Sequence, residues 1–162
     1  MNKPSAEHGD TRAAISGALD KMPEPLRAPA AAGWATLVDA QPGLARSIAA
    51  NGDTLVELSR VWATSDFVLS HCLRHPSELE FLIGPDGARK AWRAGELATD
   101  LASATEAVAD EAACQRTLRR FRSRQLMRAA WRDLAGLSTL EETLGHVSEV
   151  ADLCIASAVD FA

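Results

Sequence analysis

The sequence contains no tyrosine, and aromatic residues make up only 5% of its 162 positions. Stretches in which β-branched and aromatic residues alternate with polar ones, which would indicate strands, are also missing. Ala, Leu, Arg and Glu dominate instead, and these residues favour helices. The composition predicts an all-α protein. We expect an orthogonal helical bundle of about six to eight helices, with two long helices at the C-terminal end.

Cysteine and long apolar runs are also scarce. The three cysteines, Cys72, Cys114 and Cys154, are widely spaced and form no C-x-x-C pair. We therefore expect buried free thiols rather than disulfides or a zinc knuckle. No apolar run approaches the roughly 18 residues of a membrane span, and residues 1–11 lack the apolar core of a signal peptide. We expect a cytoplasmic protein with no membrane contact.

The common catalytic motifs are absent from the sequence. It has no P-loop, no G-x-G-x-x-G, no H-E-x-x-H and no G-x-S-x-G. His71, Cys72 and His75 form the one cluster of ligand-type side chains, but a complete metal site needs further ligands. A helix end, whose dipole suits histidine, is the favoured interpretation. No catalytic, cofactor-binding or metal-binding residue is assigned.

Helix boundaries are predicted from capping and turn signals. Asn51-Gly52 and Gly84-Pro85-Asp86-Gly87 indicate turns, and Gly136 indicates a helix end. A Ser or Thr followed three residues later by Glu indicates a helix start at four pairs: Thr54/Glu57, Ser77/Glu80, Ser103/Glu106 and Ser138/Glu141. The predicted helices span residues 11–20, 26–39, 43–50, 53–74, 77–83, 88–96, 104–135 and 139–161. We expect a flexible N-terminus over residues 1–10 and a single helical domain over residues 11–162.

The last predicted helix carries apolar residues at three- and four-residue spacing, which is typical of a face that packs in the core. These residues are Leu140, Leu144, Val147, Ala151, Cys154, Ala158 and Phe161. We therefore expect this stripe to be buried.

Charge is distributed unevenly. Residues 116–132 contain seven arginines and no acid, which leaves ten basic and 22 acidic residues elsewhere in a chain of net charge −5. Candidate docking or ion-pairing residues are Arg116, Arg119, Arg120, Arg122 and Arg124. Internal or interdomain ion pairing is favoured over an anionic partner or nucleotide, and nucleic acid is the least favoured because the chain is acidic.

The arginine segment fits a simple amphipathic helix poorly. At 100° per residue, Arg119 and Arg120 fall on the side of Leu126, Met127 and Trp131. Leu118 and Phe121 point nearly the opposite way, among Arg122, Arg128 and Arg132. Either the first turns pack by this other face, or Arg119 and Arg120 reach inward to acids, because a buried unpaired charge is costly.

Two stretches resemble a known family. The first is Val61-Trp62-Ala63-Thr64-Ser65-Asp66-Phe67-Val68, followed by His75-Pro76 and Leu79. The second runs from Leu118-Arg119-Arg120-Phe121-Arg122 through the Gln125–Leu137 segment into Leu140-Glu141-Glu142-Thr143-Leu144. Both, together with the leader Pro23-Glu24-Pro25-Leu26, are similar in order and spacing to the N-terminal portion of bifunctional glutamine synthetase adenylyltransferases. The resemblance covers roughly residues 20–160.

The resemblance implies an enzyme of bacterial nitrogen metabolism. The full-length family member attaches AMP from ATP to a tyrosine of glutamine synthetase and removes it again by phosphorolysis. It uses magnesium, and it is controlled by glutamine and the PII signalling protein. The implied partners of this chain are glutamine synthetase, PII and its own catalytic domain, which has a nucleotidyltransferase fold.

The sequence departs from the family pattern at the catalytic motif. The family has a G-x-x-x-G-G-x-E-L element followed by S-D-x-D, and no D-x-D occurs in these 162 residues. We therefore expect a fragment or truncated product that contains no cofactor site, is inactive alone and supports or docks the catalytic domain. The alternative is a stand-alone helical interaction module that binds an acidic protein partner through its arginine-rich helix.

Overall fold

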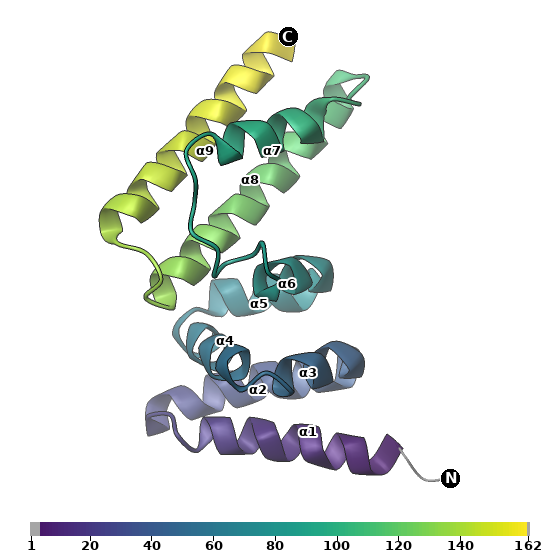
Figure 1. The fold of residues 1–162 in the computed structure, drawn as a ribbon. Helices are drawn as coiled ribbons and strands as arrows, with labels where there is room; N and C mark the ends of the chain where they lie inside the picture. The colour runs from purple at the N-terminus through teal and green to yellow at the C-terminus, as the bar shows by residue number, and fades with distance from the viewer. Residues whose placement is uncertain (1–3, 162) are drawn as a thin grey trace. The chain divides into compact units, whose positions relative to one another are not determined.

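The structure is a computed structural model that describes the backbone of residues 4–161 and the side chains of residues 9–161, in which all regular structure is helical (Figure 1). This confirms the all-α prediction. The nine helices in this range are α1 (Pro4–Leu19), α2 (Glu24–Ala40), α3 (Pro42–Ala49), α4 (Gly52–Thr64), α5 (Asp66–Arg74), α6 (Pro76–Ile83), α7 (Glu96–Thr105), α8 (Glu111–Leu134) and α9 (Leu140–Phe161). The chain divides after Ile83 into two compact units. None of the described helices is both long and apolar enough to cross a bilayer.

The first unit is organised by a pair of tryptophans. Trp34 of α2 and Trp62 of α4 are fully buried, and their ring centroids lie 5.1 Å apart. Trp34 donates its indole N–H to the Ser59 hydroxyl at 2.9 Å, and Ser59 donates in turn to the Leu55 carbonyl at 2.7 Å. The polar group that Trp34 brings into the core is thus satisfied within the same helix pair.

A glycine lets α2 approach its neighbours closely. A Cβ atom on Gly33 would lie 2.6 Å from Cδ1 of Leu69 and 2.9 Å from Cε3 of Trp62. Both distances are shorter than the van der Waals contact distance between two carbon atoms. The packing of α2 against α4 and α5 therefore depends on the absence of a side chain at Gly33.

Several helix boundaries differ from the prediction. The expected helix over residues 53–74 is interrupted at Ser65, whose extended backbone (φ −149°, ψ 103°) ends α4 and whose hydroxyl accepts from the Val68 N–H to start α5. Helix α1 begins at Pro4, earlier than residue 11, and residues 1–3 of the expected flexible N-terminus lie outside the described residues. Residues 88–95 form a loop, and α7 begins only at Glu96, so the prediction of a helix over residues 88–96 was wrong.

The four predicted capping boxes were also misplaced. Asn51, not Thr54, caps α4, and Ser103 lies inside α7. Ser77 lies inside α6. The one reciprocal box formed near a predicted site is shifted by a residue: Thr139 accepts from the Glu142 N–H at 3.2 Å, and Glu142 accepts from the Thr139 N–H at 2.9 Å.

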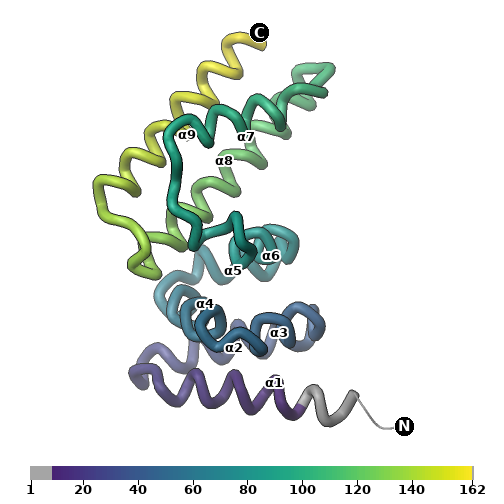
Figure 2. Tube along the Cα trace, in the orientation of Figure 1, coloured from purple at the N-terminus to yellow at the C-terminus, as the bar shows by residue number. Residues whose placement is uncertain are grey.

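The second unit is built on the two long helices that the sequence predicts. Helices α8 and α9 run side by side as an antiparallel hairpin, and α7 contacts both (Figures 1 and 2). Their shared core consists of Leu97, Leu101, Phe121 and Val150.

The predicted helix end at Gly136 is confirmed. Gly136 has a positive φ of 70°. The N–H of Leu137 bonds to the Arg132 carbonyl, and that of Gly136 to the Asp133 carbonyl. These two bonds form a Schellman motif, in which glycine takes the left-handed position without strain.

The close approach at Gly33 can be tested by adding a methyl group. We expect Gly33→Ala to lower the free energy of unfolding by about 1 kcal/mol or more, because the overpacking cost exceeds the gain in helix propensity. Gly17→Ala in α1, where a Cβ meets nothing within 4 Å, is the control. It should stabilise the protein by up to about 1 kcal/mol in urea or thermal unfolding. Equal effects of the two substitutions would contradict the packing argument.

Candidate functional site

The loop over residues 84–95 is held by two buried arginines of α8. Arg132 donates to the carbonyls of Ala88 at 2.8 Å and Lys90 at 2.9 Å, and also to that of Leu137 at 2.7 Å. Arg128 donates to the carbonyls of Gly87 at 3.1 Å and Lys90 at 2.9 Å. A loop without regular structure needs such donors for its buried carbonyls, and the planar guanidinium supplies several at once.

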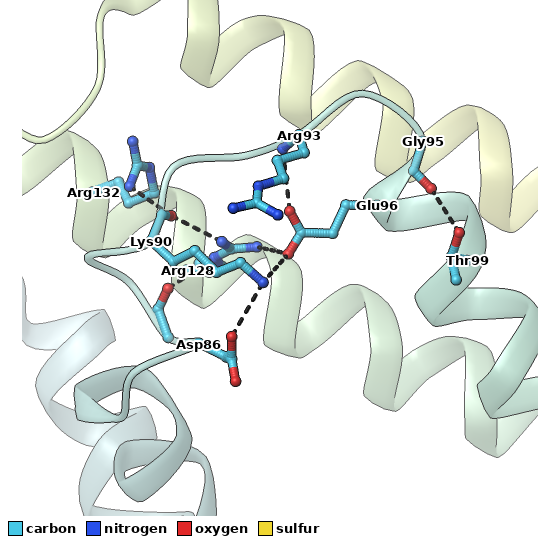
Figure 3. A network of polar contacts seen from close by, with 9 residues as sticks. Asp86, Lys90, Arg93, Gly95, Glu96, Thr99, Arg128 and Arg132 are labelled. Atoms are coloured by element: carbon cyan, nitrogen blue, oxygen red, sulfur yellow. Dashed lines mark hydrogen bonds and ion pairs between the residues drawn. The ribbon is translucent and has the colours of Figure 1, made fainter.

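A small ion network surrounds Arg128 (Figure 3). Its Nη1 lies 3.8 Å from Oε1 of Glu96, which also pairs with Lys90 at 3.2 Å. Burial would raise the pKa of Glu96, but the hydrogen bonds from Lys90 and the Arg93 N–H outweigh it, so the pKa is lowered. Burial lowers the pKa of Arg128. Glu96 therefore stays ionised and balances a buried cation.

Trp92 joins the loop to α9. Its ring stacks on His146 with centroids 3.8 Å apart, and the Arg132 guanidinium lies 4.6 Å from the Trp92 centroid. Burial, together with the charges of Arg128 and Arg132, lowers the pKa of His146 from 6.5 to about 4, against the opposing influence of the Gln125 carbonyl and Glu96. His146 is therefore neutral near pH 7 and serves as an aromatic packing group.

The five arginines that the sequence singled out lie elsewhere on α8. Arg116, Arg119, Arg120 and Arg122 are exposed, and Arg124 is half-buried. Arg119 donates to the Gln115 side chain at 3.4 Å, so the alternative in which it reaches inward was wrong. The first turns pack instead by the opposite face, through Phe121 and the half-buried Leu118.

The sequence did not lead us to Arg128 and Arg132 as the two arginines that bind the loop carbonyls. A signal was present in the sequence. The two residues are four positions apart, so they share one side of α8, and this is the side of Leu118 and Phe121. Arginines on a buried face indicate buried polar partners, and here most of those partners are carbonyls rather than the acids expected.

The apolar stripe predicted to be buried on α9 is largely exposed, which corrects that expectation. The exposed fractions are 64% for Leu140, 58% for Leu144, 37% for Val147 and 39% for Phe161, and Ile155 and Val159 add 64% and 70%. The side of α9 that packs against α7 and α8 instead carries His146, Val150, Leu153 and Cys154. Helix α9 therefore has two apolar sides, and the residues that the structure describes cover only one of them.

We call the uncovered side the outer face of α9. It consists of Leu140, Leu144, Val147, Ala151, Ile155 and Ala158, all of which are exposed. At 100° per residue these positions fall within about 80° of arc. A continuous apolar stripe along a helix of 22 residues is typical of a surface that binds another protein segment.

The cluster of His71, Cys72 and His75 lies at the end of α5, as predicted. Nε2 of His71 lies 2.6 Å from Oε2 of Glu78, and the His75 ring stands 4.6 Å from that of His71. Burial raises the pKa of the Cys72 thiol to about 11, which makes it a poor nucleophile and a poor metal ligand. All three cysteines are free, with Cys72 and Cys114 buried as predicted and Cys154 half-buried.

Removing the Arg132 side chain should release the loop. Arg132→Met removes the donor to the carbonyls of Ala88 and Leu137 and leaves the Lys90 carbonyl with Arg128 alone, so we expect a loss of at least about 2 kcal/mol of stability. Trypsin should also cleave faster after Lys90 and Arg93. Arg120→Met, at an exposed position on the same helix, should change stability by less than about 0.5 kcal/mol. An Arg132→Met protein as resistant to trypsin as the parent would contradict the role of Arg132.

His146 should make stability depend on pH. Because its pKa is lower in the folded state, its contribution is complete above pH 6.5 and is lost as the pH falls toward 4. The expected loss is about 2–3 kcal/mol. In His146→Phe, which keeps the aromatic ring, this part of the pH dependence should disappear from urea unfolding curves. Identical slopes in the two proteins between pH 6.5 and 4 would refute the assignment.

Comparison with known proteins supports the resemblance seen in the sequence. A family model described as glutamate-ammonia ligase adenylyltransferase matches residues 55–162. A curated protein from Thioalkalivibrio sulfidiphilus is 39% identical over 86% of this chain, and one from Pseudomonas aeruginosa is 38% identical over 73%. One from Nitrosococcus oceani is 37% identical over 65%. All three are named bifunctional glutamine synthetase adenylyltransferase/adenylyl-removing enzyme.

The matches cover only part of these relatives. The aligned regions span 14%, 12% and 11% of the length of the Thioalkalivibrio, Pseudomonas and Nitrosococcus proteins, respectively. No solved structure matches the chain. Since the family model covers most of these residues and the relatives share its description, the chain belongs to the glutamate-ammonia ligase adenylyltransferase family.

Proposed function

We propose that this chain is a helical, non-catalytic segment of an enzyme that adenylylates and deadenylylates glutamine synthetase, and that the outer face of α9 docks it onto the catalytic part. The observation that carries the proposal is the apolar stripe of that face, which is exposed along the whole of α9. Exposing so much apolar surface is unfavourable unless another protein segment covers it.

The chemistry of the residues agrees with a supporting role. The sequence contains no D-x-D pair, and within the described side chains no group of three His, Cys, Asp or Glu residues could hold a metal ion. The described residues therefore offer no ligand group for the magnesium implied by the family, and we assign no catalytic step to them. Contacts with glutamine synthetase and PII, and a cytoplasmic location, are part of the same proposal.

Two measurements test the proposal: the enzymatic activity of the chain alone, and its association with a relative that lacks the matching segment. Alone, the chain should neither transfer AMP from ATP to glutamine synthetase nor release AMP from the modified enzyme with phosphate. Coexpressed with the Pseudomonas aeruginosa relative from which the matching segment has been deleted, it should copurify. Leu144→Glu together with Ile155→Glu should abolish copurification, because charges would be placed in an apolar contact.

Matched controls separate docking from folding. Both substituted residues are exposed in this chain, so the melting temperature should stay nearly unchanged. Phe67→Glu, at a residue 64% exposed in the first unit, should leave copurification intact. AMP transfer or release by the chain alone would overturn the non-catalytic assignment. Copurification unaffected by the double substitution would overturn the docking role of α9.

A second candidate function rests on a different surface. Arg116, Arg119, Arg120 and Arg122 are exposed on α8 and could bind an acidic protein partner. Replacing Arg116 and Arg120 by Glu would abolish such binding and leave the contact made by α9 unchanged. The apolar stripe favours the first proposal, because exposed arginines are stable in water and need no partner.

A further inference from the structure

The first unit contains a groove between α1 and α2, with a volume of about 300 Å³. Both helices contact α3 and α4, and two small, exposed residues of α2, Ala31 and Ala35, leave the space between α1 and α2 open. The nine described residues that line the groove are far fewer than the roughly 20 that each side of a protein interface uses. A volume near the lower end of the range for ligand sites suits a small molecule.

The floor of the groove is apolar. It consists of Ile15, Trp34 and Val38, which are buried, and Leu19, which is half-buried. The indole N–H of Trp34 is bonded to Ser59, so Trp34 offers only the carbon atoms of its ring to a ligand. A molecule in this groove therefore gains free energy by placing an apolar body against the floor.

Two opposite charges lie at one end of the groove. Helices α1 and α2 are joined by a short turn and run antiparallel (Figure 1). Arg12 and Asp39 are the lining residues farthest from that turn on their helices, whereas Leu19 lies next to it. Both charged side chains are exposed, and no ion pair joins them to each other or to another described side chain. The end of the groove away from the turn thus offers a guanidinium and a carboxylate to a ligand.

We infer that this groove binds a small zwitterion with an apolar side chain, namely an apolar α-amino acid. The carboxylate of the ligand lies at Arg12, its ammonium group lies at Asp39, and its side chain extends along Trp34 toward the turn. A guanidinium binds a carboxylate through two parallel N–H donors, and a carboxylate accepts from an ammonium group. The inference does not rest on the proposed function, because no residue of α9 lines the groove.

A ligand with a single charge suits the groove less well. An apolar carboxylate pairs with Arg12 but brings a second anion near Asp39, and an apolar amine brings a second cation near Arg12 in the same way. Like charges repel each other, and salt only partly screens this repulsion at short range. The two charged groups of an amino acid are bonded to one carbon, so both lie at the same end of the ligand. The segment of α1 from residue 12 to residue 19 is about 10 Å long, which suits a side chain of the size of leucine.

Leucine and two of its analogues test the inference by NMR. The analogue 4-methylpentanoate is leucine without the ammonium group, and isopentylamine is leucine without the carboxylate. Each is titrated into the whole chain up to about 20 mM, and the affinity is obtained from the shifts of the amide signals of residues 12–19 and 31–39. Leucine should bind about threefold to fivefold more tightly than either analogue, because only leucine pairs with both charges. Glycine, which lacks the apolar side chain, should bind more weakly than leucine.

Substitutions at the two charges should each remove one preference. In Asp39→Asn, leucine and 4-methylpentanoate should bind equally, while leucine keeps its advantage over isopentylamine. In Arg12→Met, the reverse is expected. A merely structural role of these residues would not produce this crossed pattern. Ala35→Phe should fill the groove and abolish binding, whereas Ala32→Phe, at an exposed position of α2 outside the lining, should leave binding intact.

The results that contradict the inference are distinct. Absence of shifts with leucine at about 20 mM overturns it, as does equal binding of leucine and both analogues. Binding that Ala35→Phe leaves unchanged shows that the ligand lies elsewhere and also overturns the inference. None of these results bears on the docking role of α9, because Leu144 and Ile155 belong to the second unit.

Discussion

The second unit depends on the capture of loop carbonyls by two buried guanidinium groups. Residues 84–95 form no regular structure, yet several of their carbonyls are buried and need donors. Arg128 and Arg132 supply those donors, Glu96 balances part of their charge, and Trp92 fills the space between the arginines and His146. Lysine could not replace either arginine equivalently, because an ammonium group cannot span several carbonyls in one plane.

Local signals predicted the helical class, the two long helices and the stop at Gly136, because these depend on interactions within a few residues. The same signals failed where a competing interaction decided the outcome. Ser65 breaks a long predicted helix by capping the next one, and the loop before α7 stays irregular because distant arginines bind its carbonyls. No local sequence pattern can indicate the bond between Arg132 and the Ala88 carbonyl, because 44 residues separate them.

The candidate site shows a second limit of sequence reasoning. Periodicity located an apolar stripe on α9 but assigned it to the core. Whether a helix face is buried depends on what lies against it, and two faces of α9 are apolar. In this chain α7 and α8 cover the side of Val150, while Leu144 and Ile155 stay exposed. The arginines were singled out correctly as unusual, but the pair that organises the loop was not distinguished from the exposed ones.

Arg132 also has a consequence for the order in which the second unit folds. It bonds to Leu137, five residues away, and to Ala88, 44 residues away. The entropy lost in closing a chain segment grows with its length, so the turn between α8 and α9 can form while residues 84–95 are still free. Attachment of the loop closes a much longer segment and therefore costs more entropy. One side chain thus links the closure of a short segment to the closure of a long one.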